Sequence, residues 1–422
     1  MDKRLSICQQ NVLTNVSHKH NIFITGPAGT GKSFLLNYII DILKLKFTPS
    51  KVGVTAPTGI AAANVNGTTL HSWCGIGIGD STLENLVKRI RCNKPAFTRL
   101  KTAKVRIIDE ISMLDGKLFD MIDNILKVIR SNTQSFGGVQ VILCGDFYQL
   151  PPVNVDESGF AFESNVWSEA KITTYALTEI IRQKGDTEFM NVLNQIRIGT
   201  FTEEMQSIFE NCHVSVKPLP PTGIVPTKLY CLNRDVDREN MIRLESLDSE
   251  LKKFTSHDSF SAQTPSNMER MISDALNKKV ARDLHLKVGA QVMLTKNMPD
   301  KNLVNGSRGI VINFDEVGKP VVRFMTGAIL TLDPVETTQK YMQHECTRRQ
   351  YPLKLAWALT IHKSQGSSLD CVEVQVSGAF AAGQTYVALS RCTSLAGLWI
   401  SGNKVVKKHI FANEKVINFY CV

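Results

Sequence analysis

The glycine-rich segment at residues 26–33, GPAGTGKS, restricts the possible folds of this chain more than any other stretch. It fits the pattern GxxxxGK[ST], follows an apolar run at 21–25 and opens a helical pattern over 33–44. Glycines let backbone N–H groups approach phosphate without Cβ clashes, and the start of a helix adds partial positive charge. An ordinary glycine turn is the alternative, but the strand–loop–helix context favours a nucleotide site. Its expected ligands are Gly26, Pro27, Ala28, Gly29, Thr30, Gly31, Lys32 and Ser33.

Short apolar runs alternate with helical patterns around this segment, which is typical of a parallel sheet. Strands are expected at residues 21–25, 52–56, 105–109 and 139–145, with an amphipathic helix at 118–130. The pattern therefore predicts an α/β fold for the first half of the chain.

A second, smaller α/β set follows the Pro- and Gly-containing stretch 217–226, with strands expected at 227–232, 372–376 and 397–401. The intervening stretch 243–282 is polar and gives no clear prediction. Residues 291–332 are dense in Val, Ile and Gly, which indicates a small β-barrel inserted into the second α/β domain.

The composition excludes several classes of protein. With 43% hydrophobic and 21% charged residues, the chain is neither disordered nor fibrous. No apolar run reaches the length of a membrane span, and the first residues resemble neither a secretory signal nor a transit peptide. The ten cysteines form no CxxC pair, so buried thiols are expected rather than zinc or redox sites. We therefore expect an intracellular, reducing compartment. The net charge of +10 favours nucleic acid only weakly.

Two further motifs end predicted strands. Asp109 and Glu110 follow the run 105–108, where Asp109 can hold Mg²⁺ through water, together with the hydroxyl of Ser33, and Glu110 can polarise an attacking water. Gln149 follows the run 139–145 and can hydrogen-bond a γ-phosphate. The alternatives are a solvated strand end for the acidic pair and, for the glutamine, a simple turn stopped by Pro151 and Pro152.

Together these motifs resemble the Pif1 family of superfamily 1B DNA helicases over most of the chain. The segments that carry the resemblance are LSICQ (5–9, the adenine-reading Q motif), GPAGTGKS (26–33, motif I), TAPTGIAA (55–62) and GTTLHSW (67–73, motif Ia and its companion), IIDEISML (107–114, motif II), CGDFYQLPPV (144–153, motif III), LTEIIRQ (177–183, motif IV), LAWALTIHKSQGSSLD (355–370, motif V) and GQTYVALSR (383–391, motif VI).

The stretch between motifs II and III resembles the Pif1 signature segment in residues 119–130 and 136–140, which favours Pif1 over its RecD-type relatives. It departs from the signature at Lys127, where Arg is usual, and at Ser135, where Pro is usual; in motif IV, Ile181 replaces a frequent aromatic residue. Each change conserves charge or bulk or is a surface change, so activity is still expected.

The resemblance implies two RecA-like P-loop domains, each a parallel sheet flanked by helices. Domain 1A would span 1–184, with a small wedge, 1B, at about 74–100; domain 2A would span 185–255 and 346–422. An SH3-like β-barrel, 2B, would be inserted at 256–345.

The resemblance also implies ATP and Mg²⁺ as cofactors. The ATP-site residues would include Gln9, which would read adenine, and Gly366; the catalytic residues would be Lys32, Asp109, Glu110, Gln149, Arg182 and Arg391. Arg182 and Arg391 would act as arginine fingers on the γ-phosphate, because a planar cation suits the charge of the transferring phosphoryl group.

The expected macromolecular partner is single-stranded and forked DNA, with translocation from 5′ to 3′. Candidates for base stacking or for bracing the DNA track are Trp73, Tyr148 and Tyr386. We expect a monomeric motor that works beside replication or repair proteins. It would be nuclear if the source is a eukaryote or a nuclear-replicating virus. Hydroxyls, amides and lysines suit phosphate contacts without base reading. The expected DNA contacts are Thr58, His71, Lys296, Asn297, His362, Lys363, Ser364 and Tyr386.

Two other classes of function stay open at this point. A P-loop ATPase that remodels nucleoprotein without strand separation would share motifs I to III, but HKSQG and motif VI in the same chain argue against it. A non-catalytic single-strand-binding protein is disfavoured by Asp109, Glu110 and Arg391.

Overall fold

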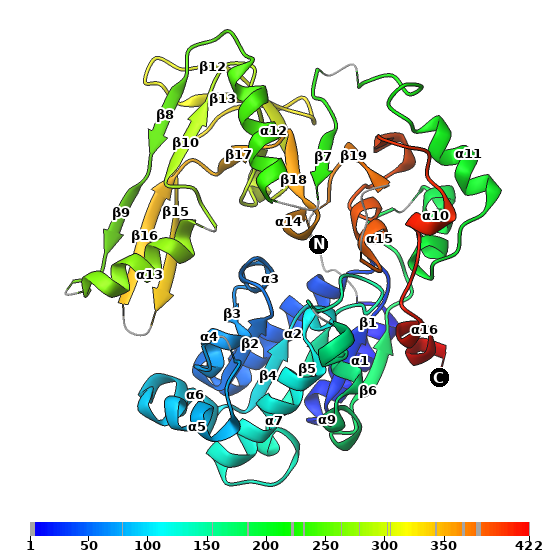
Figure 1. The fold of residues 1–422 in the computed structure, drawn as a ribbon. Coiled ribbons are helices and arrows are strands. Elements are labelled where there is room, and N and C mark those ends of the chain that lie inside the picture. The colour runs from blue at the N-terminus through cyan, green and yellow to red at the C-terminus, as the bar shows by residue number, and fades with distance from the viewer. Residues whose placement is uncertain are drawn as a thin grey trace. The chain divides into compact units, whose positions relative to one another are not determined.

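The computed structural model of the chain (Figure 1) divides into two compact units. Unit 1 comprises Met1–Thr202, Phe380–Ser390 and Val406–Val422, and unit 2 comprises Glu203–Ala379 and Arg391–Val405. The structure describes residues 5–77, 79–153, 155–183, 185–220, 223–230, 233–262, 264–277, 279–301, 303, 305–341, 344–364, 368–376 and 381–421.

Unit 1 is built on a six-stranded sheet in which every strand pair is parallel, in the order β3-β2-β4-β5-β1-β6. Parallel strands are covered on both faces, and β1, β2, β4 and β5 are accordingly buried along their whole length. The strands are β1 Ile22–Thr25, β2 Val52–Ala56, β3 Thr68–Thr69, β4 Val105–Ile108, β5 Gln140–Cys144 and β6 Thr173–Ala176.

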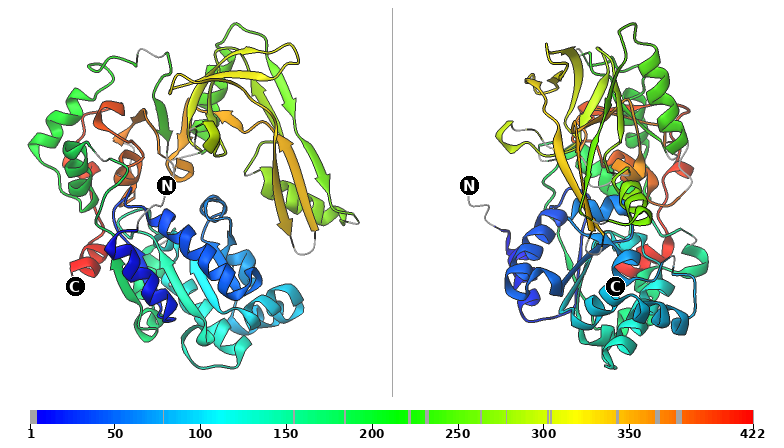
Figure 2. Two further views of the ribbon diagram at one scale, coloured as in Figure 1. Left: turned by 180° about the vertical axis from the view of Figure 1, so that it is seen from behind. Right: turned by 90° about the vertical axis from the view of Figure 1, so that its left-hand side faces the viewer.

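Helices cover both faces of this sheet (Figures 1 and 2). One apolar cluster packs α1 and α2 on one face, and a second, larger cluster packs α4, α5, α6, α7, α9 and α16 on the other. The α-helices of unit 1 are α1 Ile7–Ser17, α2 Lys32–Phe47, α3 Gly59–Asn64, α4 Leu70–Cys74, α5 Leu83–Cys92, α6 Lys94–Thr102, α7 Gly116–Arg130, α8 Val155–Ser158, α9 Asn165–Glu169, α10 Thr187–Arg197, α15 Gln384–Leu389 and α16 Glu414–Cys421.

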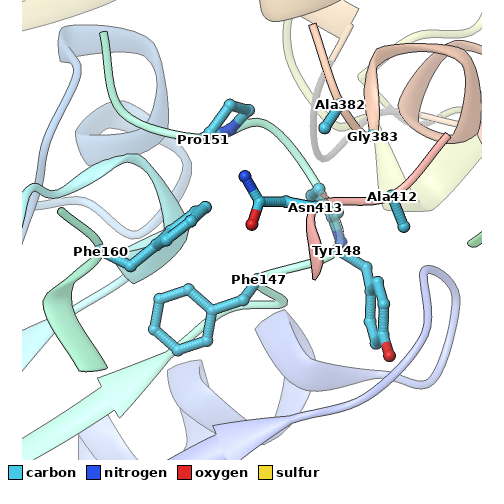
Figure 3. A pocket seen from close by; sticks show the side chains of 9 residues that line it. Phe147, Tyr148, Pro151, Phe160, Ala382, Gly383, Ala412 and Asn413 are labelled. Carbon is cyan, nitrogen blue, oxygen red and sulfur yellow. The ribbon is translucent and has the colours of Figure 1, made fainter. Parts of the chain in front are cut away.

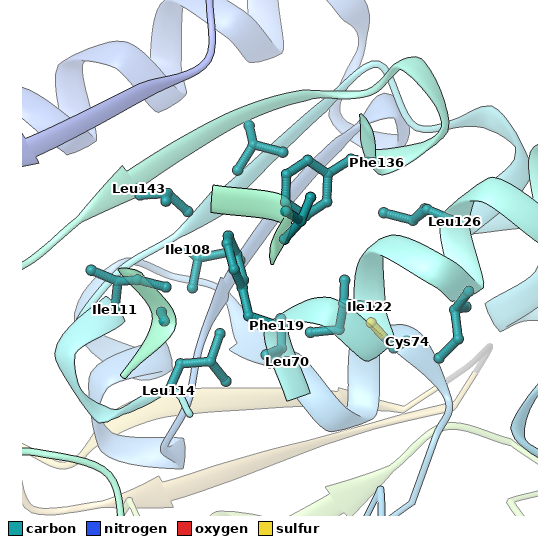
Figure 4. Packing of buried hydrophobic residues seen from close by; sticks show 14 of the residues in the cluster. Leu70, Cys74, Ile108, Ile111, Leu114, Phe119, Ile122, Leu126, Phe136 and Leu143 are labelled. Carbon is teal, nitrogen blue, oxygen red and sulfur yellow. The ribbon is translucent and has the colours of Figure 1, made fainter. Parts of the chain in front are cut away.

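The helix α7 illustrates how the sequence sets an element. Asp115 caps its start by accepting a hydrogen bond from the Leu118 N–H at 2.8 Å, and Ser131 ends it in the left-handed conformation. Its apolar residues recur at helical spacing, so Phe119, Ile122 and Leu126 all point into the larger cluster (Figure 4).

Unit 2 contains a four-stranded parallel sheet in the order β18-β7-β19-β20. Its strands are β7 Thr227–Tyr230, β18 Ala358–Thr360, β19 Val372–Val374 and β20 Leu398–Ile400; its helices are α11 Glu203–Asn211, α12 Asn233–Glu245, α13 Ser266–Asn277 and α14 Ile361–Ser364.

The remaining strands of unit 2 form antiparallel sheets. A five-stranded sheet runs β14-β13-β12-β11-β17, a pair joins β10 to β8, and a three-stranded ribbon runs β15-β16-β9. The strands are β8 Lys252–Thr255, β9 His257–Phe260, β10 Asp283–Leu286, β11 Gln291–Leu294, β12 Arg308–Phe314, β13 Pro320–Phe324, β14 Ile329–Thr331, β15 Val335–Tyr341, β16 His344–Gln350 and β17 Leu353–Leu355.

Each strand expected from an apolar run is present, within a few residues at its ends. The β-rich stretch 291–332 forms antiparallel sheet around an apolar core, while its SH3-like character stays a prediction. Residues 185–202, 380–390 and 406–422, which the resemblance assigned to domain 2A, belong to unit 1. Tyr386 of α15 is buried there, and Val416, Phe419 and Tyr420 of α16 pack in its larger apolar cluster. Six of the nine cysteines in the described part of the chain are buried, as expected, and all nine are free. In those same ranges, each helix is too short or too polar to cross a bilayer.

Candidate active site

The topology of unit 1 brings three motifs to one edge of the sheet. Strands β4, β5 and β1 are consecutive neighbours and parallel, so their carboxyl ends meet at the same edge. Asp109 follows β4, Gly145 follows β5, and Gly26 follows β1. This edge is where open α/β sheets bind their ligands.

The phosphate loop has the backbone that its glycines allow. Gly29 and Gly31 have φ of 87° and 81°, in the left-handed region, and a Cβ at Gly29 would lie 2.7 Å from the Cβ of Arg182. Helix α2 starts directly after Gly31, and no described side chain caps its first turn, which leaves N–H groups for an anion. The Lys32 ammonium donates to the carbonyls of Gly26 (2.6 Å) and Pro27 (2.9 Å). Burial lowers the pKa of Lys32, and the charge of Asp146 partly offsets that effect.

Two distant segments of unit 1 brace this loop. The N–H groups of Ile181 and Arg182 donate to the Gly29 carbonyl at 2.8 and 3.2 Å. From α15, the Tyr386 hydroxyl accepts a hydrogen bond from the Ala28 N–H at 2.7 Å. Arg182 in turn donates to the Ser390 carbonyl at 3.0 Å, and burial lowers the pKa of its guanidinium. The loop is therefore held by motif IV and motif VI segments.

Tyr386 consequently differs from its expected role. Its side chain is only 2% exposed and its hydroxyl is engaged by the phosphate loop, so in this structure a base cannot stack on it. Trp73 and Tyr148 are buried as well, Trp73 against the Arg106 guanidinium 3.9 Å from its ring and Tyr148 against Arg197 at 4.4 Å. All three aromatic side chains therefore pack against protein groups in this structure, and the expected part of Trp73 and Tyr148 in stacking or in bracing the track stays a prediction.

The acidic pair lies at the end of β4 in a strained, buried setting. Burial raises the pKa of Asp109 to about 6, although the Glu110 N–H, which donates to its carboxylate at 3.0 Å, and the Cys144 thiol act in the opposite direction. Glu110 has φ 52° and ψ 47°, a left-handed conformation that costs a non-glycine residue free energy. Strain of this kind is concentrated at functional sites.

The motif III segment lies beside this pair. Gln149 is 5% exposed, and its N–H donates to the Asp146 carbonyl at 2.9 Å. A Cβ at Gly383 would lie 2.3 Å from the Tyr148 carbonyl oxygen and 2.5 Å from that of Gln149, so motif VI packs directly on motif III. A cavity of about 10 Å³, room for one water molecule, lies at this contact (Figure 3). Its walls are Phe147, Tyr148, Gln149, Pro151, Phe160, Ala382, Gly383, Ala412 and Asn413.

Motif III is held in place by a group of three residues that was not predicted from the sequence: its own Asp146, and Arg197 and Tyr420 from two distant helices. The Asp146 carboxylate is fully buried and accepts two hydrogen bonds from Arg197 of α10, at 2.9 and 3.0 Å. On α16, the Tyr420 hydroxyl lies 2.7 Å from Thr25 Oγ1 and accepts from the Phe147 N–H at 3.2 Å. Asp146 could have been found as the acid of motif III, but Arg197 and Tyr420 have no local sequence signal.

Other predicted residues of unit 1 are accounted for as follows. Gln9 closes a capping box with Ser6 at the start of α1, and its amide nitrogen is 3.7 Å from where a Cβ of Gly31 would lie, so it flanks the phosphate loop. Thr58 accepts from the Ala61 N–H at 3.2 Å and caps α3. His71 is half-buried on α4.

In unit 2, Lys296 donates to the Glu336 carbonyl, and burial lowers its pKa. Asn297 is exposed and accepts from the Asn305 N–H at 2.8 Å. Ser364 is 1% exposed with its hydroxyl on the Ile361 carbonyl at 2.7 Å, and Arg391 is 2% exposed. Gly366 and the side chains of His362 and Lys363 lie outside the described residues.

Comparison with known proteins gives consistent matches. The family model of PIF1-like helicases matches residues 4–207, and that of the DNA helicase Pif1 2B domain matches 275–314. The ATP-dependent DNA helicase PIF1 of Xenopus laevis is 40% identical over 99% of this chain. This chain spans 64% of the length of that protein, less than two thirds.

Two crystal structures extend the comparison. Pif1 helicase from Candida albicans is 40% identical with a TM-score of 0.79, and the match covers 99% of both chains. Pif1 helicase from Bacteroides in complex with ADP-AlF3 and ssDNA is 30% identical with a TM-score of 0.64, and the match covers 100% of this chain and 97% of that chain.

Proposed function

Because the chain belongs to the PIF1-like helicase family, we propose that it is an ATP-dependent DNA helicase. The observation that carries this proposal is the edge of the unit 1 sheet, where the phosphate loop, the acidic pair and Gln149 follow three neighbouring parallel strands. Hydrolysis of a nucleoside triphosphate requires a loop that binds phosphate, a carboxylate that can hold a metal ion and a base for the attacking water. The phosphate loop, Asp109 and Glu110 are the candidates for these three parts.

The nucleotide is ATP, with Gln9 beside the loop as the adenine-reading residue. Lys32 and the N–H groups at the start of α2 bind the β- and γ-phosphates, and Arg182 adds positive charge next to Gly29. Glu110 is the general base for the attacking water, and Gln149 hydrogen-bonds the γ-phosphate. Arg391 belongs to unit 2, and its role as an arginine finger is proposed from motif VI alone.

Mg²⁺ fits the donor groups present. Ser33 is exposed in the first turn of α2, and Asp109 directly follows β4. The Ser33 hydroxyl and the Asp109 carboxylate are both hard oxygen donors of the kind that Mg²⁺ prefers. When bound, the ion would neutralise charge that develops on the phosphate oxygens. Ser33 would contact it directly and Asp109 through water.

The polymer is single-stranded and forked DNA, and the proposed direction is 5′ to 3′, as in the family. Support comes from the Bacteroides relative, which was crystallised in complex with ADP-AlF3 and ssDNA. Thr58, His71, Lys296 and Asn297 remain the proposed phosphate contacts among the described side chains. Ser364 and Tyr386, which were expected beside them, are 1% and 2% exposed in this structure and are not kept as contacts. A monomeric motor in a reducing compartment, nuclear in a eukaryotic setting, completes the proposal.

The test uses the purified full chain. We expect single-stranded DNA to stimulate ATP hydrolysis and the protein to displace a strand from substrates with a 5′ overhang but not from those with a 3′ overhang. The Lys32→Ala variant should fold normally and lose hydrolysis by roughly 100-fold or more, as when a preorganised charge partner is removed. Stimulated hydrolysis without strand displacement would support the alternative, a P-loop ATPase that remodels nucleoprotein.

A further inference from the structure

Strand β4 contains a buried arginine that the stability of the fold does not explain. The Arg106 side chain is 1% exposed, and its Nε and Nη1 atoms have no hydrogen-bond partner among the described residues. Its Nη2 atom donates to Cys74 Sγ at 3.4 Å, and burial lowers the pKa of the guanidinium. Unpaired donors in a protein interior cost free energy of folding, so a residue of this kind calls for another explanation.

The guanidinium lies against the indole of Trp73, which covers the sheet beside it. Arg106 and Gly53 are direct partners on the neighbouring strands β4 and β2. A Cβ at Gly53 would lie 2.5 Å from Cζ2 of Trp73, so the indole fits there because residue 53 has no side chain. The guanidinium carbon of Arg106 is 3.9 Å from the centre of the Trp73 ring, the geometry of a cation–π contact.

Through these contacts Arg106 fixes the short helix α4 to the sheet. Trp73 and Cys74 are its last two residues, and Cys74 lies inside the larger apolar cluster (Figure 4). A helix of five residues has little stability of its own, so its position depends on tertiary contacts. The same helix carries His71, a proposed phosphate contact, and three residues after Arg106 the chain reaches Asp109.

We propose that Arg106 is a positioning residue that couples single-stranded DNA to ATP hydrolysis, because it joins α4, which carries His71, to β4, which leads to Asp109. Arg106 and Cys74 are both buried and cannot touch DNA themselves, so the effect passes through α4. Natural chains keep a destabilising group where activity depends on it, which accounts for the unpaired donors. This inference rests on the proposed helicase function.

The first test replaces the arginine in the full chain by an apolar side chain of similar length. In Arg106→Met, the oligo(dT) concentration for half-maximal activation of the ATPase should rise roughly fivefold or more, the size of a typical coupling between two sites. The thermal midpoint should be equal or higher, because exchange of a buried charge for an apolar isostere is often neutral or stabilising. The DNA-free ATPase rate of each variant serves as its own reference.

The matched control is Ile129→Val, which removes one methylene from the same apolar cluster at α7. This variant should have a lower thermal midpoint and unchanged activation by oligo(dT). A loss of activation that Ile129→Val shares would show that packing alone is responsible and would overturn the proposal. Unchanged activation in Arg106→Met would overturn it as well.

A second pair of variants tests the contact if Arg106→Met does not fold. Cys74→Ser keeps an acceptor for the guanidinium, whereas Cys74→Ala removes it. We expect Cys74→Ala to need about two- to threefold more oligo(dT), as for one lost hydrogen bond, and Cys74→Ser to behave as the unmodified chain. Equal effects of the two changes would contradict the assigned contact. Failure of the helicase proposal itself would show separately, as an unmodified chain whose ATPase ignores single-stranded DNA.

Discussion

At the scale of single residues, the acidic pair shows how the site opposes local preference. Glu110 adopts a left-handed backbone that a glycine would adopt more readily, and Asp109 keeps its carboxylate in a buried setting that raises its pKa. Both features cost stability and both serve placement of a charge at the edge of the sheet. The two residues could be predicted from the strand and its terminal Asp-Glu, but their strain and burial could not, because these depend on β5 and motif III packing beside them.

The role of Glu110 as general base predicts a selective loss of turnover. In Glu110→Gln the side chain keeps its size but cannot accept the proton, so kcat for ATP should fall roughly 10²–10⁴-fold with little change in nucleotide affinity. Steady-state ATPase measurements and binding of a fluorescent ATP analogue separate the two quantities. Glu157→Gln, an exposed carboxylate of unit 1, is the control and should be neutral. Retained turnover in Glu110→Gln would remove the residue from the mechanism.

The buried Asp109 predicts a dependence of stability on pH. Its pKa of about 6 in the folded chain lies above the ordinary value of 3.8, so between these values the folded state holds more protons than the unfolded state. The contribution of Asp109 to stability is therefore greatest below about pH 4 and falls as the pH rises to about 6. Urea unfolding without nucleotide or Mg²⁺ should find Asp109→Asn more stable relative to wild type at pH 7 than at pH 4.5. A difference independent of pH would contradict this assignment.

At the scale of elements, α16 is the least expected part of the site. Phe419 stacks on Phe162 at 4.4 Å, Tyr420 stacks on Tyr148 at 4.9 Å, and the Tyr420 hydroxyl reaches the residue just before the phosphate loop. Burial raises the pKa of that hydroxyl, so it stays neutral and able to donate. The short helix α16 begins 261 residues after the end of motif III (414 − 153), and no local sequence signal indicates that the two pack together, because only tertiary packing joins them.

This contact predicts that α16 positions motif III. Tyr420→Phe keeps the ring stack but removes the hydroxyl that binds Thr25 and Phe147, so kcat for ATP should fall about tenfold while KM changes less. The loss of these two hydrogen bonds should also lower the free energy of unfolding by roughly 1–3 kcal/mol. Tyr38→Phe, at an exposed tyrosine of α2, is the matched control. A purely structural role would lower stability alone, with kcat unchanged once the protein is folded.

At the scale of the whole molecule, the parallel sheets were predictable and the antiparallel part of unit 2 was less so. Strands such as β1 and β5 are continuous apolar runs because both faces are buried, and such runs stand out in a sequence. In the ribbon of β9, β15 and β16, β16 alternates buried with half-buried or exposed residues, β9 alternates exposed with half-buried residues, and the strands are rich in Thr, Arg and His. In this ribbon Arg348 is fully buried and donates two hydrogen bonds to the Asp258 carboxylate. The two residues are 90 positions apart, so no local sequence pattern indicates this pairing.

The division of the chain into two units passes through motif VI, since Ser390 belongs to unit 1 and Arg391 to unit 2. If Arg391 is an arginine finger, Arg391→Ala should still bind ATP but hydrolyse it roughly 10³-fold more slowly in the presence of single-stranded DNA. Arg391→Lys keeps the charge without the planar fork, so it should recover little of the rate. Because Arg391 is buried, thermal unfolding must first establish that both variants fold. A folded Arg391→Ala variant that no longer binds nucleotide would place this residue in affinity, and one with an unchanged rate would leave Arg182 as the remaining candidate finger.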